Sequence, residues 1–272
     1  MIFKLHIPKP PLIQFIENIV YYSGFNPPHS KERLLPDGAI ELVINLEEGP
    51  KHIYDNEDHG KRTAYCKGWI SGIRKEYITI DSGQNSSMMV VRFRDGGAAP
   101  FFKFPLNEIS YRVVEMQDIW SSQFDSIRDK IIEAQTPEAR IAILEMAMLQ
   151  IGKNRLEINP CIEYAVNHFR NLSNGATIRS LSDKIGYSHK HFIHLFENQV
   201  GVSPKVFSRI SKFQRALGML ERNEPVNWPQ IAHDCGYYDQ AHFINEFRRF
   251  SGINPSAYFE NRGEYFNYLP IY

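Results

Sequence analysis

The sequence predicts an α+β protein with two domains, a β-rich N-terminal domain and an all-α C-terminal domain. In residues 1 to about 120, short stretches such as residues 40–46 alternate apolar and polar side chains, which is typical of half-buried strands. In residues 155–262, apolar side chains instead recur every three or four positions, as they do along one face of a helix. This second segment also repeats itself, and the repeat defines its architecture most closely.

Composition and charge exclude several classes of protein. Hydrophobic residues make up 43% of the 272 residues, which is ordinary for a globular protein. No stretch approaches about 18 uninterrupted apolar residues, and the N-terminal residues lack the pattern of a signal peptide, so we expect neither a membrane span nor secretion. Three distant cysteines, Cys66, Cys161 and Cys235, do not form a disulfide framework or a zinc-binding pattern. These features predict a cytoplasmic protein.

The N-terminal half is expected to form a small antiparallel barrel or sandwich followed by helices. Further strands are expected at residues 64–70, 76–80 and 88–93, and turn-forming residues at 81–85 separate the last two. A first helix is expected at residues 124–134. Short strands at this spacing are typical of barrels and sandwiches.

A second helix, expected from Thr136 to about residue 151, carries an apolar stripe of Ile141, Leu144 and Met148. The stripe exceeds what a small barrel needs to cover, so it predicts a homodimer held by the helices between about 124 and 150. Residues 152–155 are polar and are expected to form a short linker. The predicted boundaries are therefore 1–152 for the β-rich domain, 155–262 for the helical domain and 263–272 for a C-terminal tail.

The internal repeat has two copies. The first is residues 186–207, GYSHKHFIHLFENQVGVSPKVF, and the second is residues 236–258, GYYDQAHFINEFRRFSGINPSAY. The two leading glycines are 50 positions apart, whereas the later pair Phe196 and Phe247 is 51 apart. The second copy thus has one extra residue in its turn. A duplicated pattern of this length is far more selective than a short motif.

Each copy predicts two helices joined by a tight turn, which is the helix-turn-helix unit. Residues suited to cap the four helices stand at their expected starts, namely Thr177, Ser188, Asn227 and Asp239. Gly186 and Gly236 occupy the two turns, where glycine tolerates a left-handed backbone. Ser203-Pro204 begins a long helix between the units, and Asn159-Pro160 begins another before them, so the domain is expected to contain about seven helices.

A local excess of positive charge lies within this repeat, although the formal charge of the chain is zero. Residues 179–215 contain seven Lys or Arg and two Asp or Glu, which gives a net charge of +5. Such a patch on a neutral protein is what binding to phosphates requires. A solvated helix face is the alternative that charge by itself leaves open.

Residues 155–262 resemble the DNA-binding domain of the AraC/XylS family of bacterial transcription regulators. The resemblance rests on positions in both copies, namely Gly186-Tyr187-Ser188, Phe196, Gly201-Val202-Ser203-Pro204, Ala216, Ile231-Ala232, Gly236-Tyr237, Phe243, Phe247 and Gly252-Ile253-Asn254-Pro255. It implies that one domain lays two recognition helices into successive major grooves of operator DNA, with RNA polymerase as a further partner. The family usually has Arg where Lys212 stands, and often has Arg in its recognition helices.

Side chains on the recognition helices that face away from the core are candidates for contact with bases. In the first helix these candidates are His189, Lys190 and His194. In the second they are Gln240 and Asn245. Amide side chains suit adenine and lysine suits guanine. Simple solvation remains the alternative for each.

Other polar side chains near the same helices are better candidates for contact with phosphates, which position a protein without specifying a sequence. They are Ser188, Lys205, Arg209, Arg248 and Arg249. Metal binding by His191 and His194 is not expected, because no Cys or acidic ligand accompanies them at a matching spacing. The sequence also contains no pattern for a catalytic nucleophile or a cofactor site.

In many relatives of this family an N-terminal cupin-like barrel binds a small effector. Residues 35–38 (LPDG) and 91–94 (VRFR) resemble a poorly characterised N-terminal domain found in part of the family. The histidine pattern of catalytic cupins is missing, so a metal centre is not expected. Aromatic side chains on strands commonly line pockets, and we expect Trp69 or Phe93 to line an effector cavity.

These observations favour a sequence-specific transcription regulator controlled by an effector or by dimerisation. Three alternatives remain open. The N-terminal domain could serve assembly only, an enzyme could be fused to a DNA-binding module, or DNA binding could have been lost. The sequence leaves the effector, the operator and the choice between activation and repression open.

Overall fold

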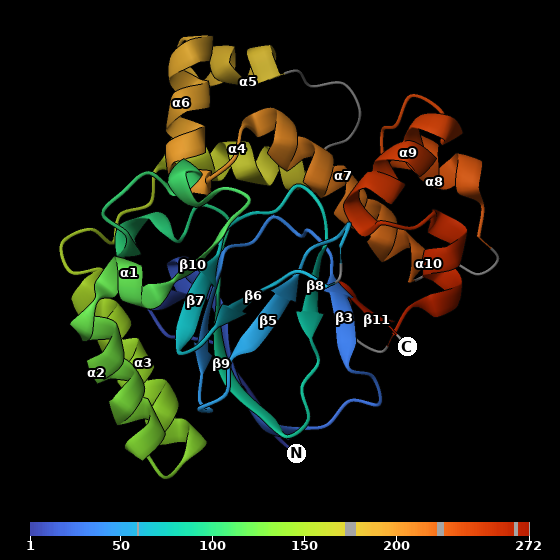
Figure 1. Ribbon diagram of the computed structural model, residues 1–272. Helices are drawn as coiled ribbons and strands as arrows, with labels where there is room; N and C mark the ends of the chain where they lie inside the picture. Colours follow the sequence, from blue (N-terminus) through green and yellow to red (C-terminus); the bar gives the residue numbers. More distant parts are fainter. Residues whose placement is uncertain (59, 172–177, 222–225, 264–265, 272) are drawn as a thin grey trace.

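The computed structural model describes residues 1–272 except 59, 172–177, 222–225, 264–265 and 272. Its N-terminal domain contains two antiparallel sheets (Figure 1). The six-stranded sheet has the order β1 (Ile2–His6), β2 (Ile16–Phe25), β9 (Ser86–Phe93), β4 (Glu41–Asn45), β7 (Gly68–Ser71) and β10 (Val113–Glu115). The five-stranded sheet has the order β11 (Tyr268–Ile271), β3 (Lys31–Leu34), β8 (Ile78–Asp81), β5 (Lys51–Tyr54) and β6 (Arg62–Tyr65). The predicted β-rich domain of short antiparallel strands is confirmed.

Strand β4 is buried on both faces, so the prediction of a half-buried strand at residues 40–46 is wrong. Leu42 and Ile44 lie in the main hydrophobic core. Val43 points the other way and packs with Trp69 and Met88 in a second apolar cluster. The strand lies between β9 and β7 in the middle of its sheet, with a packed layer on each side.

The predicted strand at residues 64–70 is two strands. Its first part belongs to β6, which pairs with β5, and its second part is β7, which pairs with β4. The chain crosses from one sheet to the other at Cys66 and Lys67. An unbroken run of strand-forming residues does not reveal such a crossing, because both halves have the same local preference.

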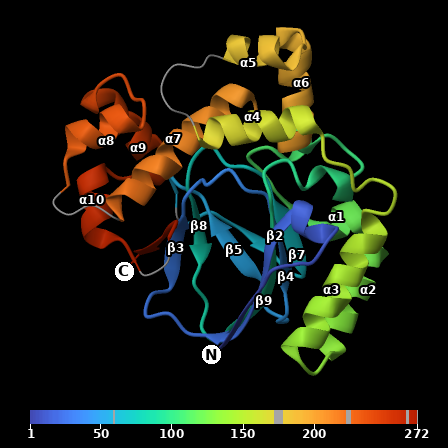
Figure 2. The same ribbon diagram turned by 180° about the vertical axis from the view of Figure 1, so that it is seen from behind.

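The helices of the N-terminal domain pack beside the six-stranded sheet (Figure 2). They are the short helices η1 (Leu12–Gln14), η2 (Ala99–Phe101) and η3 (Leu106–Ile109), then α1 (Met116–Trp120), α2 (Ser122–Glu133) and α3 (Pro137–Ile151). Both predicted helices are present, and Thr136 caps α3 by accepting a hydrogen bond from the Ala139 amide. However, Ile141, Leu144 and Met148 are buried within this subunit. The stripe therefore packs in the core of its own subunit. It does not support the predicted homodimer.

The C-terminal domain is entirely helical up to residue 261 in its described part, and the expected seven helices are present. They are α4 (Pro160–Arg170), α5 (Ile178–Ile185), α6 (His189–Val200), α7 (Pro204–Leu220), α8 (Trp228–Asp234), α9 (Gln240–Ser251) and α10 (Pro255–Asn261). Helix α7 connects one group of helices with the other, as Figure 1 shows. Among the described helices, none is both long and apolar enough to cross a bilayer.

After α10 the chain returns to the N-terminal domain. Strand β11 pairs with β3, with Tyr268 opposite Leu34 and Ile271 opposite Lys31. Sequence analysis predicted only a tail there, because four residues with a proline among them carry a weak strand signal. The helical domain is thus attached to the β-rich domain at both of its ends, and one continuous hydrophobic core includes residues of both.

Candidate functional site

Two helix-turn-helix units form the C-terminal domain, α5 with α6 and α8 with α9. Gly186 and Gly236, which stand between the helices of each unit, have φ angles of 80° and 74°, in the left-handed region that glycine tolerates. Ser188 caps α6 and Asp239 caps α9, each accepting a backbone hydrogen bond two residues into its helix. The predicted cap Thr177 lies outside the described residues.

Helix α7 holds the second unit through hydrogen bonds from Lys212, Arg209 and Arg215. Lys212 Nζ donates to the Gly236 carbonyl oxygen at 2.7 Å, so this lysine fixes the turn of the second unit. Arg209 makes two hydrogen bonds to the Glu246 carboxylate, at 2.6 and 2.8 Å. Burial by itself would raise the pKa of Glu246, but the Arg209 guanidinium lowers it below the usual value.

The outer face of the first recognition helix, α6, is polar and exposed. His189, Lys190 and His194 are all exposed, while Phe192 and Phe196 are fully buried. His194 is engaged by Asn198, with 3.0 Å between the His194 Nε2 and Asn198 Nδ2 atoms. The geometry thus places all three predicted base-reading residues of this helix on a surface that another molecule can reach.

The second recognition helix, α9, has the same arrangement with different chemistry. Gln240 and Asn245 are exposed, and Phe243 and Phe247 are buried beneath them. In the turn ahead of this helix, Tyr238 is 92% exposed. The sequence pattern does not distinguish Tyr238, because an aromatic residue in a repeat is more often part of the core.

The predicted phosphate contacts fall into two groups. Ser188, Lys205, Arg248 and Arg249 are exposed. Arg209 is different, because its guanidinium group donates two hydrogen bonds to the Glu246 carboxylate. Its side chain is only 28% exposed. We therefore withdraw Arg209 as a phosphate contact and assign it to the packing of α7 on α9.

Both recognition helices contact the N-terminal domain at their C-terminal ends. Gly201, which ends α6, accepts a hydrogen bond from the Ser110 hydroxyl just after η3. Gly252, which ends α9, lies so close to Tyr77 that a Cβ atom there would come within 2.4 Å of the ring. Arg33 stacks on the Tyr77 ring at 4.7 Å and donates to the Ser251 carbonyl oxygen at 3.4 Å.

The loop after η3 also lies between the two units. Burial raises the pKa of the Tyr111 phenol, and Glu197 of α6 adds to that shift, whereas Arg209 of α7 and Arg249 of α9 oppose it. One side chain of the N-terminal domain is therefore near charged groups on three helices of the other domain. Sequence analysis could not find Tyr77 or Tyr111, because these contacts join residues far apart in the chain.

Two segments singled out in the N-terminal sequence, LPDG and VRFR, meet in the structure. Arg92 Nη1 lies 2.6 Å from Asp37 Oδ2 and 2.8 Å from Glu41 Oε1, and Arg92 Nε lies 3.0 Å from Glu17 Oε2. Burial would raise the pKa of Asp37, but Arg92 and then Arg74 lower it. Burial and the neighbouring Asp37 raise the pKa of Glu41 despite Arg92.

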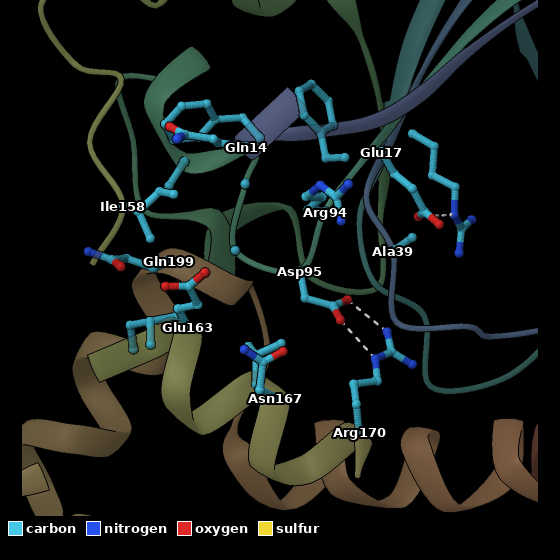
Figure 3. Close-up of a pocket in the computed structure, with 18 of the residues that line it drawn as sticks. Gln14, Glu17, Ala39, Arg94, Asp95, Ile158, Glu163, Asn167, Arg170 and Gln199 are labelled. Carbon is cyan, nitrogen blue, oxygen red and sulfur yellow. Dashed lines mark hydrogen bonds and ion pairs between the residues drawn. The ribbon is translucent and has the colours of Figure 1, made fainter. Parts of the chain in front are cut away.

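A polar cavity of about 660 Å³ lies between the N-terminal domain and helix α4 (Figure 3). Across it, Asp95 accepts two hydrogen bonds from Arg170, at 2.7 and 2.8 Å. Arg170 also donates to the Asp37 carbonyl oxygen at 3.0 Å. Glu163 and Asn167 project from α4 toward the same space. The helical domain is thus hydrogen-bonded to the loop that carries the Arg92 partner Asp37.

A second cavity, of about 430 Å³, lies between the two sheets and is lined from β1, β2, β9 and β4 on one side and from β3 and β11 on the other. Asp37 and Arg92 border both cavities. Neither Trp69 nor Phe93 lines this second cavity. Trp69 packs with Val43 and Met88, and Phe93 lies on the opposite face of the sheet, at the edge of the first cavity.

Histidine clusters do not form a metal site in the described part of the chain, where no group of three or more His, Cys, Asp or Glu side chains is arranged to hold an ion. His191 and His194, the pair weighed in the sequence, are both exposed on α6. His191 instead contacts the edge of Tyr187, with ring centroids 4.8 Å apart.

Two known families of domains match parts of this chain. Residues 181–261 match a family described as a helix-turn-helix domain, and residues 4–115 match a domain of unknown function (DUF6597). The first match begins within α5 and covers the rest of both units and the helix between them. This match supports the resemblance of the C-terminal domain to the AraC/XylS family. Lys212, which stands where that family usually has Arg, holds the Gly236 carbonyl group.

Two curated relatives match part of the chain. One is the probable transcriptional regulator LumQ of Photobacterium leiognathi, 28% identical over 90 residues, which are 33% of this chain and 36% of LumQ. The other is an uncharacterized HTH-type transcriptional regulator of Haemophilus influenzae, 30% identical over 81 residues, which are 30% of this chain and 27% of that protein. The chain thus spans about a third of the length of the curated relatives it matches.

Solved structures similar to the chain include ToxT of Vibrio cholerae, with 9% identity, a TM-score of 0.47 and coverage of 95% of this chain and 98% of ToxT. The C-terminal domain of AraT, a response regulator of Geobacillus stearothermophilus, has 20% identity, a TM-score of 0.37 and coverage of 40% of this chain and 93% of that domain. At such identities, residue roles do not transfer from one protein to the other.

Proposed function

We propose that this protein is a sequence-specific DNA-binding regulator of transcription. The observation that supports this proposal most directly is the orientation of the two recognition helices. Each has its C-terminal end against the N-terminal domain, at Gly201 and Gly252, and its N-terminal end free and exposed, at His189 and Gln240. Helix-turn-helix proteins contact base edges with the N-terminal residues of their recognition helices.

The base-reading roles are assigned to the exposed side chains of α6 and α9. Lys190 suits the acceptors of guanine, and Gln240 and Asn245 suit adenine, while His189 and His194 extend the polar face of α6. Ser188, Lys205, Arg248 and Arg249 remain the proposed phosphate contacts, because they are exposed beside the same helices. Tyr238 joins them as a candidate, since its ring is 92% exposed at the edge of α9.

Control by a small effector is the second part of the proposal. The cavity between the two sheets borders the Arg92–Asp37 ion pair, and the Asp37 carbonyl oxygen accepts a hydrogen bond from Arg170 of the DNA-binding domain. A ligand that moves Arg92 or Asp37 therefore changes a contact between the domains. A conformational effect requires such a difference in ligand contacts between two states.

A homodimer remains part of the proposal, on a different surface from the one first considered. Strand β1 is an edge strand whose Ile2, Phe3 and Leu5 are more than half exposed, and Met146 of neighbouring α3 is 64% exposed. Exposed apolar side chains on an edge strand favour pairing with a second chain. RNA polymerase is the proposed partner at promoters.

We propose no catalytic role. The curated relatives are named as transcriptional regulators, and burial raises the pKa of the Cys235 thiol to about 11, which makes it a poor nucleophile.

Selection of duplexes from a random pool tests the DNA-binding proposal with the full-length protein. We expect an enriched sequence with two half-sites about 10 base pairs apart, bound far more tightly than a scrambled duplex. Affinity for both duplexes should fall by orders of magnitude between about 50 and 200 mM salt, because bound phosphates release counterions. A folded protein that enriches no sequence and retains no duplex even at low salt would refute the proposal.

A further inference from the structure

The cavity between the two sheets has an unusual lining for an apolar barrel interior. Three carboxyl groups face it, from Glu32, Asp37 and Glu41, whereas Arg92 is the single cationic side chain among the lining residues. Met1, which is 67% exposed, also belongs to the lining. The interior thus has more carboxyl groups than cationic side chains.

The charge of Arg92 is already balanced within this wall. It lies 2.6 Å from Asp37 and 2.8 Å from Glu41, and Glu17 adds a third contact at 3.0 Å. Glu32 lies on the opposite sheet, where the nearest basic partner is the His29 ring at 3.3 Å. The carboxyl groups of Glu32 and Glu41 are therefore the ones with the weakest compensation.

The pKa shifts of these acids agree with their positions. Burial raises the pKa of Glu32 despite its hydrogen bond with His29, and burial together with Asp37 raises the pKa of Glu41 despite Arg92 and Arg74. A cation placed between them would favour their ionised forms and lower both values.

Aromatic side chains form much of the remaining wall. Tyr22 and Phe25 of β2 lie edge to face at 5.8 Å, and Phe3, Phe266 and Tyr268 complete the lining. Burial raises the pKa of the Tyr22 and Tyr268 phenols, and Glu32 raises both further. Tyr22 and Tyr268 thus add phenol groups to a lining that also contains carboxyl and amide side chains.

We propose that this cavity binds an organic cation, an amine or amidine attached to an aromatic or aliphatic group, as the effector of the protein. The cationic head lies between Glu32 and Glu41, where carboxylates compensate its charge. The apolar part lies against Tyr22 and Phe25, and aromatic faces add attraction for the cation itself. The phenol groups of Tyr22 and Tyr268, which belong to the same lining, accept or donate the remaining hydrogen bonds.

The same ligand would touch both domains, which is how it would act as an effector. Phe266, Asn267 and Tyr268 line the cavity and follow directly after the DNA-binding domain. On the other side, Asp37 lines it and accepts a hydrogen bond from Arg170 of α4 through its carbonyl oxygen. The ligand class follows from the cavity alone, but its role as effector rests on the function proposed above.

Calorimetric titration of the full-length protein with four small probes of similar shape tests the ligand class. The cations are 2-phenylethylamine and benzamidine, the neutral probe is 2-phenylethanol, and the anion is phenylacetate. We expect both cations to bind at least tenfold more tightly than the neutral and anionic probes. Equal binding of all four, a preference for phenylacetate, or no binding of either cation at millimolar concentration would overturn the proposal.

Two variants locate the site. Glu32→Gln keeps the shape of the side chain and removes its charge, so affinity for both cations should fall at least tenfold. Glu133→Gln, an exposed position at the end of α2, removes the same charge outside the cavity and should leave affinity unchanged. Loss of affinity in Glu133→Gln, or none in Glu32→Gln, would place the cation elsewhere and contradict the assignment.

Binding to DNA is measured separately, with and without 2-phenylethylamine at saturation. Saturated protein with unchanged DNA affinity would retain the ligand class and refute control by an effector. Sequence-specific DNA binding by a protein that binds neither cation would refute the ligand class and leave the DNA-binding function in place.

Discussion

The two helix-turn-helix units share a scaffold and differ in the surfaces they expose. Both have a left-handed glycine in the turn, a capped recognition helix and two fully buried phenylalanines beneath it. The first unit exposes Lys190 and histidines, whereas the second exposes Gln240 and Asn245. The comparison teaches that the repeat determines the fold of each unit, while the exposed positions, which packing does not restrict, determine what each can bind.

The two units also differ in how the N-terminal domain holds them. The first is held by a hydrogen bond from the Ser110 hydroxyl to the Gly201 carbonyl group. The second is held by the Tyr77 ring packed against Gly252, with Arg33 stacked on that ring. The N-terminal domain therefore contacts the equivalent glycines Gly201 and Gly252 through different kinds of interaction, a hydrogen bond and a packed aromatic ring. This difference allows each contact to be broken separately.

The largest effect is expected from Gly252→Ala, compared with Gly186→Ala as its matched control. Both glycines have a left-handed φ angle, 76° and 80°, so each substitution should cost about 1–2 kcal/mol. A Cβ at Gly252 would also collide with Tyr77, whereas nothing lies within 4 Å at Gly186. We expect Gly252→Ala to lose about 1–3 kcal/mol more, because an added methyl group overpacks the contact.

Thermal unfolding of the two variants measures this difference. In a Tyr77→Ala background the extra loss at Gly252 should disappear, since the colliding ring is absent. Equal losses at Gly186 and Gly252 in the wild-type background would mean that the second unit is not packed on Tyr77.

The next effect separates the chemistry of the two recognition helices. Asn245→Ala should weaken binding to the specific duplex by about 1–3 kcal/mol and leave binding to scrambled DNA nearly unchanged, because an amide gains only from the correct base edge. Lys190→Ala should weaken binding to both duplexes by similar factors, because a positive charge attracts any phosphate. Fluorescence anisotropy titrations with both duplexes provide the comparison. Should Asn245→Ala reduce both affinities equally, α9 does not read bases at that position.

The smallest effect concerns the ion pair between Arg209 of α7 and Glu246 of the second unit. Glu246→Gln should lower the free energy of unfolding by less than about 1 kcal/mol at pH 7, because the pair is partly exposed. The pKa of Glu246 is lower in the folded protein than its usual value, so its stabilising contribution is present above about pH 4 and is lost as the pH falls further. Denaturant unfolding at pH 7 and below pH 4 checks the sign. A variant that remains less stable by the same amount at the lower pH would exclude the ion pair as the cause.

Local sequence patterns predicted the C-terminal domain well. Gly186 and Gly236 have the left-handed backbone expected of them, and Ser188 and Asp239 make the expected capping bonds. These features depend on residues close together in the chain, so their signals are local. Because the motif occurs twice, each of these predictions was supported by two copies of the same pattern.

The parts that the sequence did not predict depend on distant residues. The pairing of β11 with β3 joins Tyr268 to Leu34, and the lining of the cavity between the sheets comes from six strands and the residues before β11. The segments LPDG and VRFR were noticed as motifs, but the ion pair between Asp37 and Arg92 became visible only with the register of β4 and β9. Trp69 and Phe93 remain predicted effector contacts that the cavity does not include.

Hydroxyl-radical footprinting of the full-length protein on its selected duplex tests the central claim most directly, that both units read DNA together. Two recognition helices in successive major grooves should protect two patches on one face of the duplex, about 10 base pairs or 34 Å apart. Asn245→Ala should weaken one patch more than the other, because that side chain belongs to the second unit alone. A single protected patch that does not change with Asn245→Ala would contradict the claim and leave α9 without a role in reading DNA.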